Sequence, residues 1–244
     1  MSGTALITLN RPTAGNSLNL DLAKHLLRET QAAVENDQHI IVLSAEGPLF
    51  CAGGDVSAMN LASDPSSFTR ELADTLHQSL LLIAQSATTL VAVVNGAAAG
   101  AGFGLVLNAD YVIATPRAGF TPAYTALGVS PDGGTSFFLP RVVGKTRASE
   151  LILAGRRLDA QTALEWGIVN ELVAESELET QLGKFLSRLE RVPAGALRAS
   201  KRLLLAPWLE QYRVHLDLER DSIAELITST ESMALQNTFL SKKG

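Results

Sequence analysis

The segment TTLVAVVNGAAAGAGFGLVLNADYVIAT, residues 88–115, decides the fold. It begins and ends with short apolar runs, TTLVAVV and ADYVIAT, which are typical of buried strands. Between them, residues 96–104 contain only glycine, alanine and one phenylalanine. No side chain in this part could transfer a proton, attack a carbon or bind a metal, so any chemistry performed there must come from the backbone N–H groups.

The same alternation of elements continues towards the N-terminus. Residues 5–9 and 39–45 are short apolar runs that predict strands, and residues 18–36 and 66–86 carry apolar side chains at helical spacing. Strands that alternate with helices at this spacing predict an α/β fold with parallel strand pairing.

The chain changes in character near residue 190, where it becomes rich in leucine and charged residues and offers no further strand. We therefore expect a core over residues 1–190 and a helical C-terminal region over residues 191–244. This region has more apolar side chains than a lone surface helix would expose, which indicates a role in oligomerisation. They include Leu216, Leu218, Ile223, Leu226 and Ile227.

Composition excludes several classes of function. The chain has 244 residues, 46% of them hydrophobic and 18% charged, with a net charge of −5, so no basic excess suggests a nucleic-acid partner. Cys51 is the single cysteine, which excludes an intrachain disulfide and predicts a buried structural thiol. No apolar run reaches 18 residues and no secretory signal is evident. We expect a cytoplasmic protein without a membrane partner.

Familiar site motifs are missing. The GKT triplet at 144–146 has Leu139 where a phosphate-binding loop needs glycine. The histidines are scattered without metal-ligand spacing, so we expect each to be a surface or helix-face residue and expect no metal site. They are His25, His39, His77 and His215.

Two glycine-rich turns remain, EGPLFCAGGDVSAM at 46–59 and the segment quoted at the start. Backbone N–H groups where a helix begins lack intrahelical partners and lie at the positive end of its dipole. Two converging donors of this kind could stabilise an oxyanion, one donor being worth roughly 3–4 kcal/mol of barrier. Alternatively, the small residues only allow helix and sheet to pack closely.

Several motifs occur together in a recognisable order, namely NRPTAGNSLN, LFCAGGDVSAM, VNGAAAGAGFGLVLNADYVIAT, LGVSPDGGTSFFLPRVVG and ALEWGIVNELV. In order and spacing they resemble the crotonase (enoyl-CoA hydratase/isomerase) superfamily over essentially the whole chain. The resemblance implies a crotonase-like spiral of β-β-α units, assembly into homotrimers or homohexamers, and acyl-CoA thioester substrates. Coenzyme A would be part of the substrate, and no separate cofactor is expected.

The resemblance also implies positions for the site. The thioester oxygen would be held by the backbone N–H groups of Gly54 and Ala101. The acyl-CoA would lie along Ala52, Gly53, Gly54, Asp55 and Val56, with Asp55 more suited to capping the following helix than to catalysis.

Departures from the family pattern are informative. Hydratases of the family use two glutamates, and the corresponding positions are Gly104 and Ala123, so a plain hydratase is not expected. Asp132 occupies the position where the isomerase branches carry their acid/base, and one carboxylate suffices for a 1,3-proton shift. Because it lies in a P-D-G sequence, Asp132 could instead be a turn residue.

The sequence therefore predicts an enoyl-CoA isomerase that uses Asp132 as a single acid/base above a backbone oxyanion hole. Three alternatives stay open: a ring 1,2-epoxyphenylacetyl-CoA isomerase, a weak enoyl-CoA hydratase, and a non-catalytic acyl-CoA-binding member of the family. Binding alone needs the two N–H groups but not Asp132, so this residue separates the enzymes from the binding protein.

Overall fold

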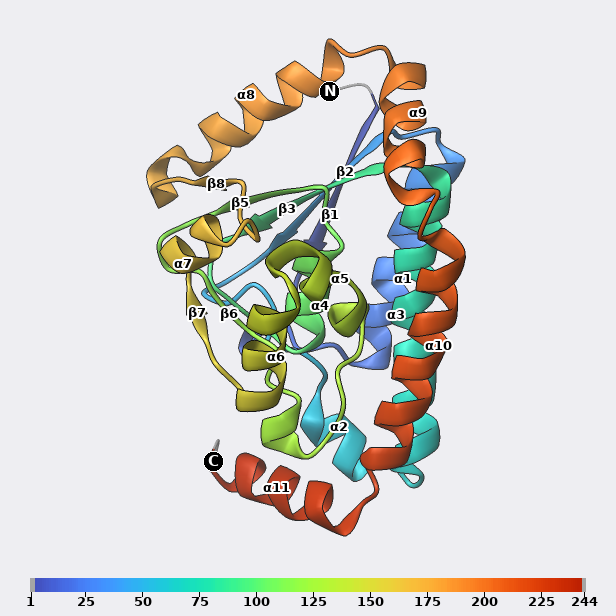
Figure 1. The fold of residues 1–244 in the computed structure, drawn as a ribbon, viewed down its shortest axis with the longest axis vertical. Coiled ribbons are helices and arrows are strands. Elements are labelled where there is room, and N and C mark those ends of the chain that lie inside the picture. Colours follow the sequence, from blue (N-terminus) through green and yellow to red (C-terminus); the bar gives the residue numbers. More distant parts are fainter. Residues whose placement is uncertain (1–2, 243–244) are drawn as a thin grey trace.

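The computed structural model describes residues 3–242 and is built around a five-stranded parallel sheet (Figure 1). Its strands, in spatial order, are β1 (Thr4–Leu9), β2 (Ile40–Ala45), β3 (Thr89–Val94), β5 (Tyr111–Ala114) and β8 (Glu171–Leu172). Every neighbouring pair is parallel, as the alternation of strands and helices predicted.

A second, smaller sheet explains the spiral. It contains β4 (Ala97–Ala99), β6 (Gly119–Thr121) and β7 (Leu158–Asp159), with β4 and β6 parallel and β6 and β7 antiparallel. The chain alternates between the two sheets: β3 of the large sheet is followed by β4 of the small one, and β5 is followed by β6. Each such pair leads into helical structure, which gives the predicted β-β-α units.

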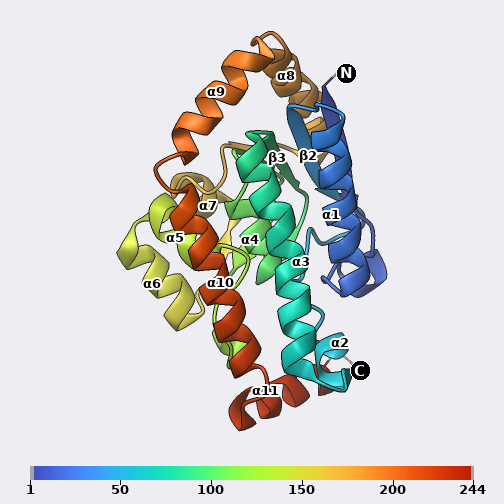
Figure 2. The same cartoon turned by 90° about the vertical axis from the view of Figure 1, so that its right-hand side faces the viewer.

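Three long helices lie side by side along one side of the molecule (Figures 1 and 2). They are α1 (Leu20–Glu35), α3 (Pro65–Ser86) and α10 (Leu209–Leu226). Helix α3 begins where Asp64 accepts a hydrogen bond from the N–H of Ser67 at 3.0 Å, with Pro65 at the first helical position. Its apolar stripe, which includes Leu72 and Leu76, is buried in the core.

The remaining helices are short or lie at the periphery. They are α2 (Val56–Leu61), α4 (Ala101–Leu107), α5 (Thr135–Val143), α6 (Lys145–Ala154), α7 (Ala160–Glu165), α8 (Leu178–Glu190), α9 (Ala194–Leu205) and α11 (Thr230–Ser241), with 3₁₀ helices η1 (Pro12–Ala14), η2 (Thr125–Leu127) and η3 (Glu175–Glu177).

The C-terminal region is helical over nearly all of its described part, as predicted, but three of the five apolar residues named above are covered by the chain itself. Leu216, Ile223 and Ile227 are buried in the same hydrophobic core as α3. Leu218 and Leu226 stay exposed. Helix α10 therefore packs on the core as one of its covering layers. The domain division at residue 190 and the role of the C-terminal region in oligomerisation remain predictions.

Two features expected from composition can be compared with the structure. Cys51 is fully buried, and burial raises the pKa of its thiol to about 12, so it is a structural thiol, as predicted. Between residues 3 and 242, no helix combines the length and the apolar character needed to cross a membrane.

Candidate functional site

A cavity of about 1020 Å³ contains every residue that the sequence analysis assigned to the site. The two glycine-rich turns form one wall, and the rest is formed by residues 11–18, helices α2, α3, α10 and α11, and residues 123–132. The lining is mostly apolar, which suits an acyl chain. The predicted site residues that line it are Ala52, Gly53, Gly54, Asp55, Val56, Ala101 and Asp132.

The two glycine-rich turns lie against each other. Cys51 forms an isolated parallel bridge with Ala98, and its carbonyl oxygen accepts a hydrogen bond from the N–H of Ala99 at 2.9 Å. Gly53 has a φ of 96°, and a Cβ at this position would lie 2.9 Å from the carbonyl oxygen of Ala99. The close approach of the turns thus requires glycine at position 53.

The N–H groups of Gly54 and Ala101 donate no hydrogen bond to an acceptor within residues 3–242. Ala101 is the first residue of α4, where a helix leaves its N–H groups without partners. Beside Gly54, the carbonyl oxygen of Gly53 accepts a bond from Leu18, and Asp55 donates one to Leu18, so the turn itself is fixed. Both residues line the cavity, and their N–H groups can bind an anionic oxygen there.

Asp55 has the structural role that was expected of it. It caps α2: its Oδ1 accepts a hydrogen bond from the N–H of Ala58 at 3.2 Å. Its Oδ2 lies 2.6 Å from Nη1 of Arg11, which also donates to the carbonyl oxygen of Ser17. Arg11 belongs to the NRP motif, and the sequence analysis did not assign it this contact.

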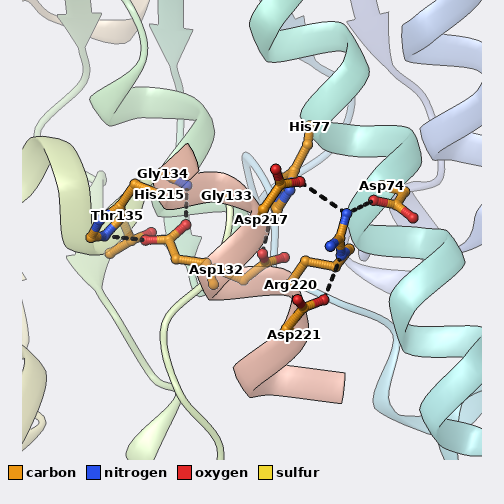
Figure 3. Close-up of polar contacts among 12 residues, drawn as sticks. Asp74, His77, Asp132, Gly133, Gly134, Thr135, His215, Asp217, Arg220 and Asp221 are labelled. Carbon is orange, nitrogen blue, oxygen red and sulfur yellow. Dashed lines mark hydrogen bonds and ion pairs between the residues drawn. The ribbon is translucent and has the colours of Figure 1, made fainter. Parts of the chain in front are cut away.

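Asp132 forms a buried pair with His77 (Figure 3). Asp132 is 6% exposed and His77 is 4% exposed, and Oδ1 of the carboxylate lies 2.7 Å from Nε2 of the imidazole. Burial acts to lower the pKa of His77, but the charge and the hydrogen bond of Asp132 raise it above its ordinary value. The two side chains therefore interact directly in a part of the site that is shielded from solvent.

From the sequence, His77 was expected to be a surface or helix-face residue without a role in the site, and its burial against Asp132 corrects this expectation. The residue does lie on a helix face, but that face is buried and meets the turn that carries Asp132. The one available signal was its position directly after Leu76 in the apolar stripe of α3, where a solvent-exposed histidine would be out of place.

Glu219 is a second buried acid that the sequence analysis missed, because it lies among other charged residues on α10. Its Oε2 accepts a hydrogen bond from the N–H of Gly134 at 2.6 Å, and its Oε1 accepts one from the N–H of Ser136 at 2.8 Å and another from the Ser136 hydroxyl. Burial, followed by the charge of Asp132, raises the pKa of Glu219 to about 7.

The neighbouring Arg220 links α10 to α3, because its Nη1 lies 2.9 Å from Oδ1 of Asp74 (Figure 3).

His77, Asp132 and Glu219 are also the described residues whose types and spacing could hold a cation, since one donor atom from each lies within 4.8 Å of the others. These donors are already engaged. His77 bonds to Asp132, and both oxygens of Glu219 accept bonds from residues 134 and 136. We therefore interpret the cluster as a hydrogen-bond network.

Gly104 and Ala123, which occupy the positions expected for the two hydratase glutamates, have different surroundings. A Cβ at Gly104 would lie 2.8 Å from the carbonyl oxygen of Gly133 and 3.1 Å from the hydroxyl of Thr135. The turn that carries Asp132 thus occupies the space that a side chain at 104 would need. Ala123 lines the cavity in a left-handed conformation, with a φ of 60°.

Comparisons with known proteins agree with this geometry. The family model described as enoyl-CoA hydratase/isomerase matches residues 1–243. A Streptococcus mutans trans-2-decenoyl-[acyl-carrier-protein] isomerase is 31% identical over 90% of this chain and 86% of its own length. A 4-chlorobenzoyl coenzyme A dehalogenase from Arthrobacter is 35% identical over 78% and 70%, respectively. The crystal structure of an enoyl-CoA hydratase from Bacillus halodurans aligns with a TM-score of 0.91 and 28% identity, covering 98% of this chain and 97% of that one.

Proposed function

Because this chain belongs to the enoyl-CoA hydratase/isomerase family, the crotonase superfamily, we propose that it is an enoyl-CoA isomerase that moves a double bond by proton transfer through Asp132. One observation carries the proposal. Asp132 lines the same cavity as Gly54 and Ala101, whose N–H groups have no partner within residues 3–242, while the glutamate positions of a hydratase hold Gly104 and Ala123.

The proposed reaction uses the two walls of the cavity together. The thioester oxygen accepts hydrogen bonds from Gly54 and Ala101, so the negative charge of a dienolate can rest there. Asp132 takes a proton from the carbon next to the double bond and returns it two carbons away, which leaves the thioester intact. A single carboxylate performs both transfers, and His77 holds it in place.

The test is a screen of 3-enoyl-, 2-enoyl- and aromatic-ring acyl-CoA thioesters that monitors migration of the double bond. We expect turnover of 3-enoyl-CoA and very slow hydration of crotonyl-CoA, because loss of one general acid–base group costs about 10²–10⁴-fold. Rapid hydration without double-bond migration would overturn the proposal. A ring-epoxide isomerase would instead convert a ring epoxide of an aromatic acyl-CoA, and a non-catalytic binding protein would bind these thioesters without any turnover.

The His77–Asp132 pair favours a second candidate, hydrolytic dehalogenation of an aryl-CoA, the activity named for the Arthrobacter relative. Asp132 would attack the ring carbon that carries the halogen and expel the halide, and His77 would activate water to hydrolyse the aryl ester. We rank it second because the double-bond shift needs only Asp132 and the two backbone N–H groups, whereas dehalogenation also requires His77 to act as a base. Release of chloride from 4-chlorobenzoyl-CoA would reverse this order.

The assembly proposed for the protein is a homotrimer or homohexamer. Support comes from large apolar side chains that stay exposed on α9 and α10, among them Leu203, Leu204 and Leu218. Light scattering at micromolar concentration should give three or six times the mass of one chain. A stable monomer would contradict the proposal.

A further inference from the structure

The turn that carries Asp132 is held by side chains from other parts of the chain. The hydroxyl of Tyr124 donates to the carbonyl oxygen of Asp132 at 2.8 Å, and Nδ2 of Asn108 donates to the carbonyl oxygen of Gly133 at 3.0 Å. These two side chains provide donors for carbonyl oxygens of the turn. The N–H groups that follow in the turn need an acceptor of their own.

Glu219 supplies that acceptor. Its two oxygens accept hydrogen bonds from the N–H groups of Gly134 and Ser136, the first and third residues after the Asp132–Gly133 pair. Gly133 and Gly134 both adopt left-handed φ values, 65° and 78°. Because glycine has little conformational preference, this backbone would not keep one geometry without external contacts.

We propose that Glu219 is a positioning residue for the proton transfer: it fixes the Gly134–Ser136 backbone and so holds the Asp132 carboxylate against His77 at the cavity. The inference rests on the proposed role of Asp132. It makes α10, a helix of the C-terminal region, a part of the active site.

The surroundings of Glu219 suit this role better than that of an ordinary helix cap. It is 4% exposed, and a buried carboxylate is unfavourable unless its oxygens are fully used. Here the Ser136 hydroxyl donates to Oε1 and its own oxygen lies 2.8 Å from Nε2 of His215, which can donate to it. Glu219 and His215, which both lie on α10, thus contact the same serine and together hold the turn.

Glu219→Gln tests the proposal. The amide keeps the size of the side chain but has one oxygen and one NH₂ group, and the NH₂ cannot accept from Gly134 or Ser136. We expect kcat on 3-enoyl-CoA to fall roughly 10- to 100-fold, as expected when catalytic groups are misplaced. The affinity for a saturated acyl-CoA should stay within about threefold, because Gly54 and Ala101 are untouched.

Asp110→Asn is the matched control for stability. This carboxylate also accepts a backbone N–H, that of Leu90 at 2.7 Å, and pairs with Lys201, but it does not line the cavity. It should lower Tm while leaving kcat per folded molecule unchanged. Equal losses of kcat in Asp110→Asn and Glu219→Gln would mean that Glu219 contributes stability alone.

A double-mutant cycle gives the decisive measurement. If Glu219 acts through Asp132, adding Glu219→Gln to Asp132→Asn should not lower the residual rate further. A further loss as large as in the wild-type background would overturn the inference, as would a normal kcat in Glu219→Gln when Asp132→Asn is inactive. Wild-type turnover in Asp132→Asn would instead overturn the proposed function itself.

Discussion

The two walls of the cavity differ in the chemical groups that they present: backbone N–H groups on one, an ionisable side chain on the other. One wall, residues 52–56 and 99–101, presents backbone N–H groups between glycines and alanines. The other, the side-chain wall, presents Asp132 to the cavity, and outside the lining His77 from α3 contacts Asp132 while Glu219 from α10 contacts the turn that carries it. In the first wall the proposed donors are backbone N–H groups, and its ionisable side chain, Asp55, is engaged with Arg11 and Ala58. The second places ligand atoms of three ionisable groups within 4.8 Å of one another.

This difference predicts that the two walls are sensitive to different kinds of substitution. The backbone wall should tolerate changes of charge nearby but not an added Cβ, since its donors depend on a close approach of two turns. The side-chain wall should tolerate small changes of shape but not the loss of a charge, because its buried groups depend on each other.

The largest effect is expected from Asp132→Asn, which removes the basic form from the side-chain wall and keeps its size. The proton shift should fall about 10²–10⁴-fold, the usual contribution of a positioned general base. Acyl-CoA affinity should change only a few-fold because the backbone wall is intact. Turnover and thioester affinity are measured on the same folded preparation, and unchanged turnover would show that Asp132 is only a turn residue.

Gly53→Ala should break the backbone wall instead. The new Cβ would meet the carbonyl oxygen of Ala99 at 2.9 Å, and φ at this position is 96°, so the two turns must separate. We expect turnover to fall by up to about 10²–10³-fold, the range for loss of one oxyanion donor. Stability should fall by about 1–3 kcal/mol.

Gly183→Ala is the matched control for Gly53→Ala. Position 183 lies in α8, and a Cβ there would meet no heavy atom within 4 Å. This substitution should leave turnover unchanged and raise stability by roughly 0.5–1 kcal/mol, because alanine favours the helix. If Gly53→Ala behaved in the same way, the close contact between the turns would not matter for function.

A further prediction concerns the stability of the side-chain wall as a function of pH. The pKa of Glu219 rises from its ordinary 4.5 to about 7, so between these values the folded protein keeps a proton that the unfolded chain loses. The contribution of Glu219 is therefore complete below pH 4.5 and is lost as the pH rises through 7, with a size of about 3 kcal/mol. The raised pKa of His77 acts in the same direction.

Denaturant unfolding of wild type and Glu219→Gln between pH 5 and 8 checks this expectation. The free energy of unfolding of the wild type, relative to the variant, should fall as the pH rises, since glutamine does not titrate. Parallel curves for the two proteins would show that Glu219 ionises normally in the folded state.

The amino-acid sequence by itself determined the backbone wall. Runs such as TTLVAVV predict strands from local pattern, and the parallel sheet and the two turns follow from their order. The position of Asp132 at the cavity was predicted from the resemblance to the family, whereas its P-D-G sequence alone indicated only a turn. Such features depend on residues close together in the chain, which is why pattern and motif spacing can reveal them.

Only the tertiary structure decided what surrounds Asp132. His77 lies 55 residues before it, and Glu219 lies 85 residues after Gly134, so no local pattern links either residue to the turn. Helix periodicity shows which face of a helix is apolar, but not which polar group on that face will meet a partner. The partner, and with it the charge state of a buried group, depends on how distant segments pack, because pKa values respond to burial and to charges a few ångströms away.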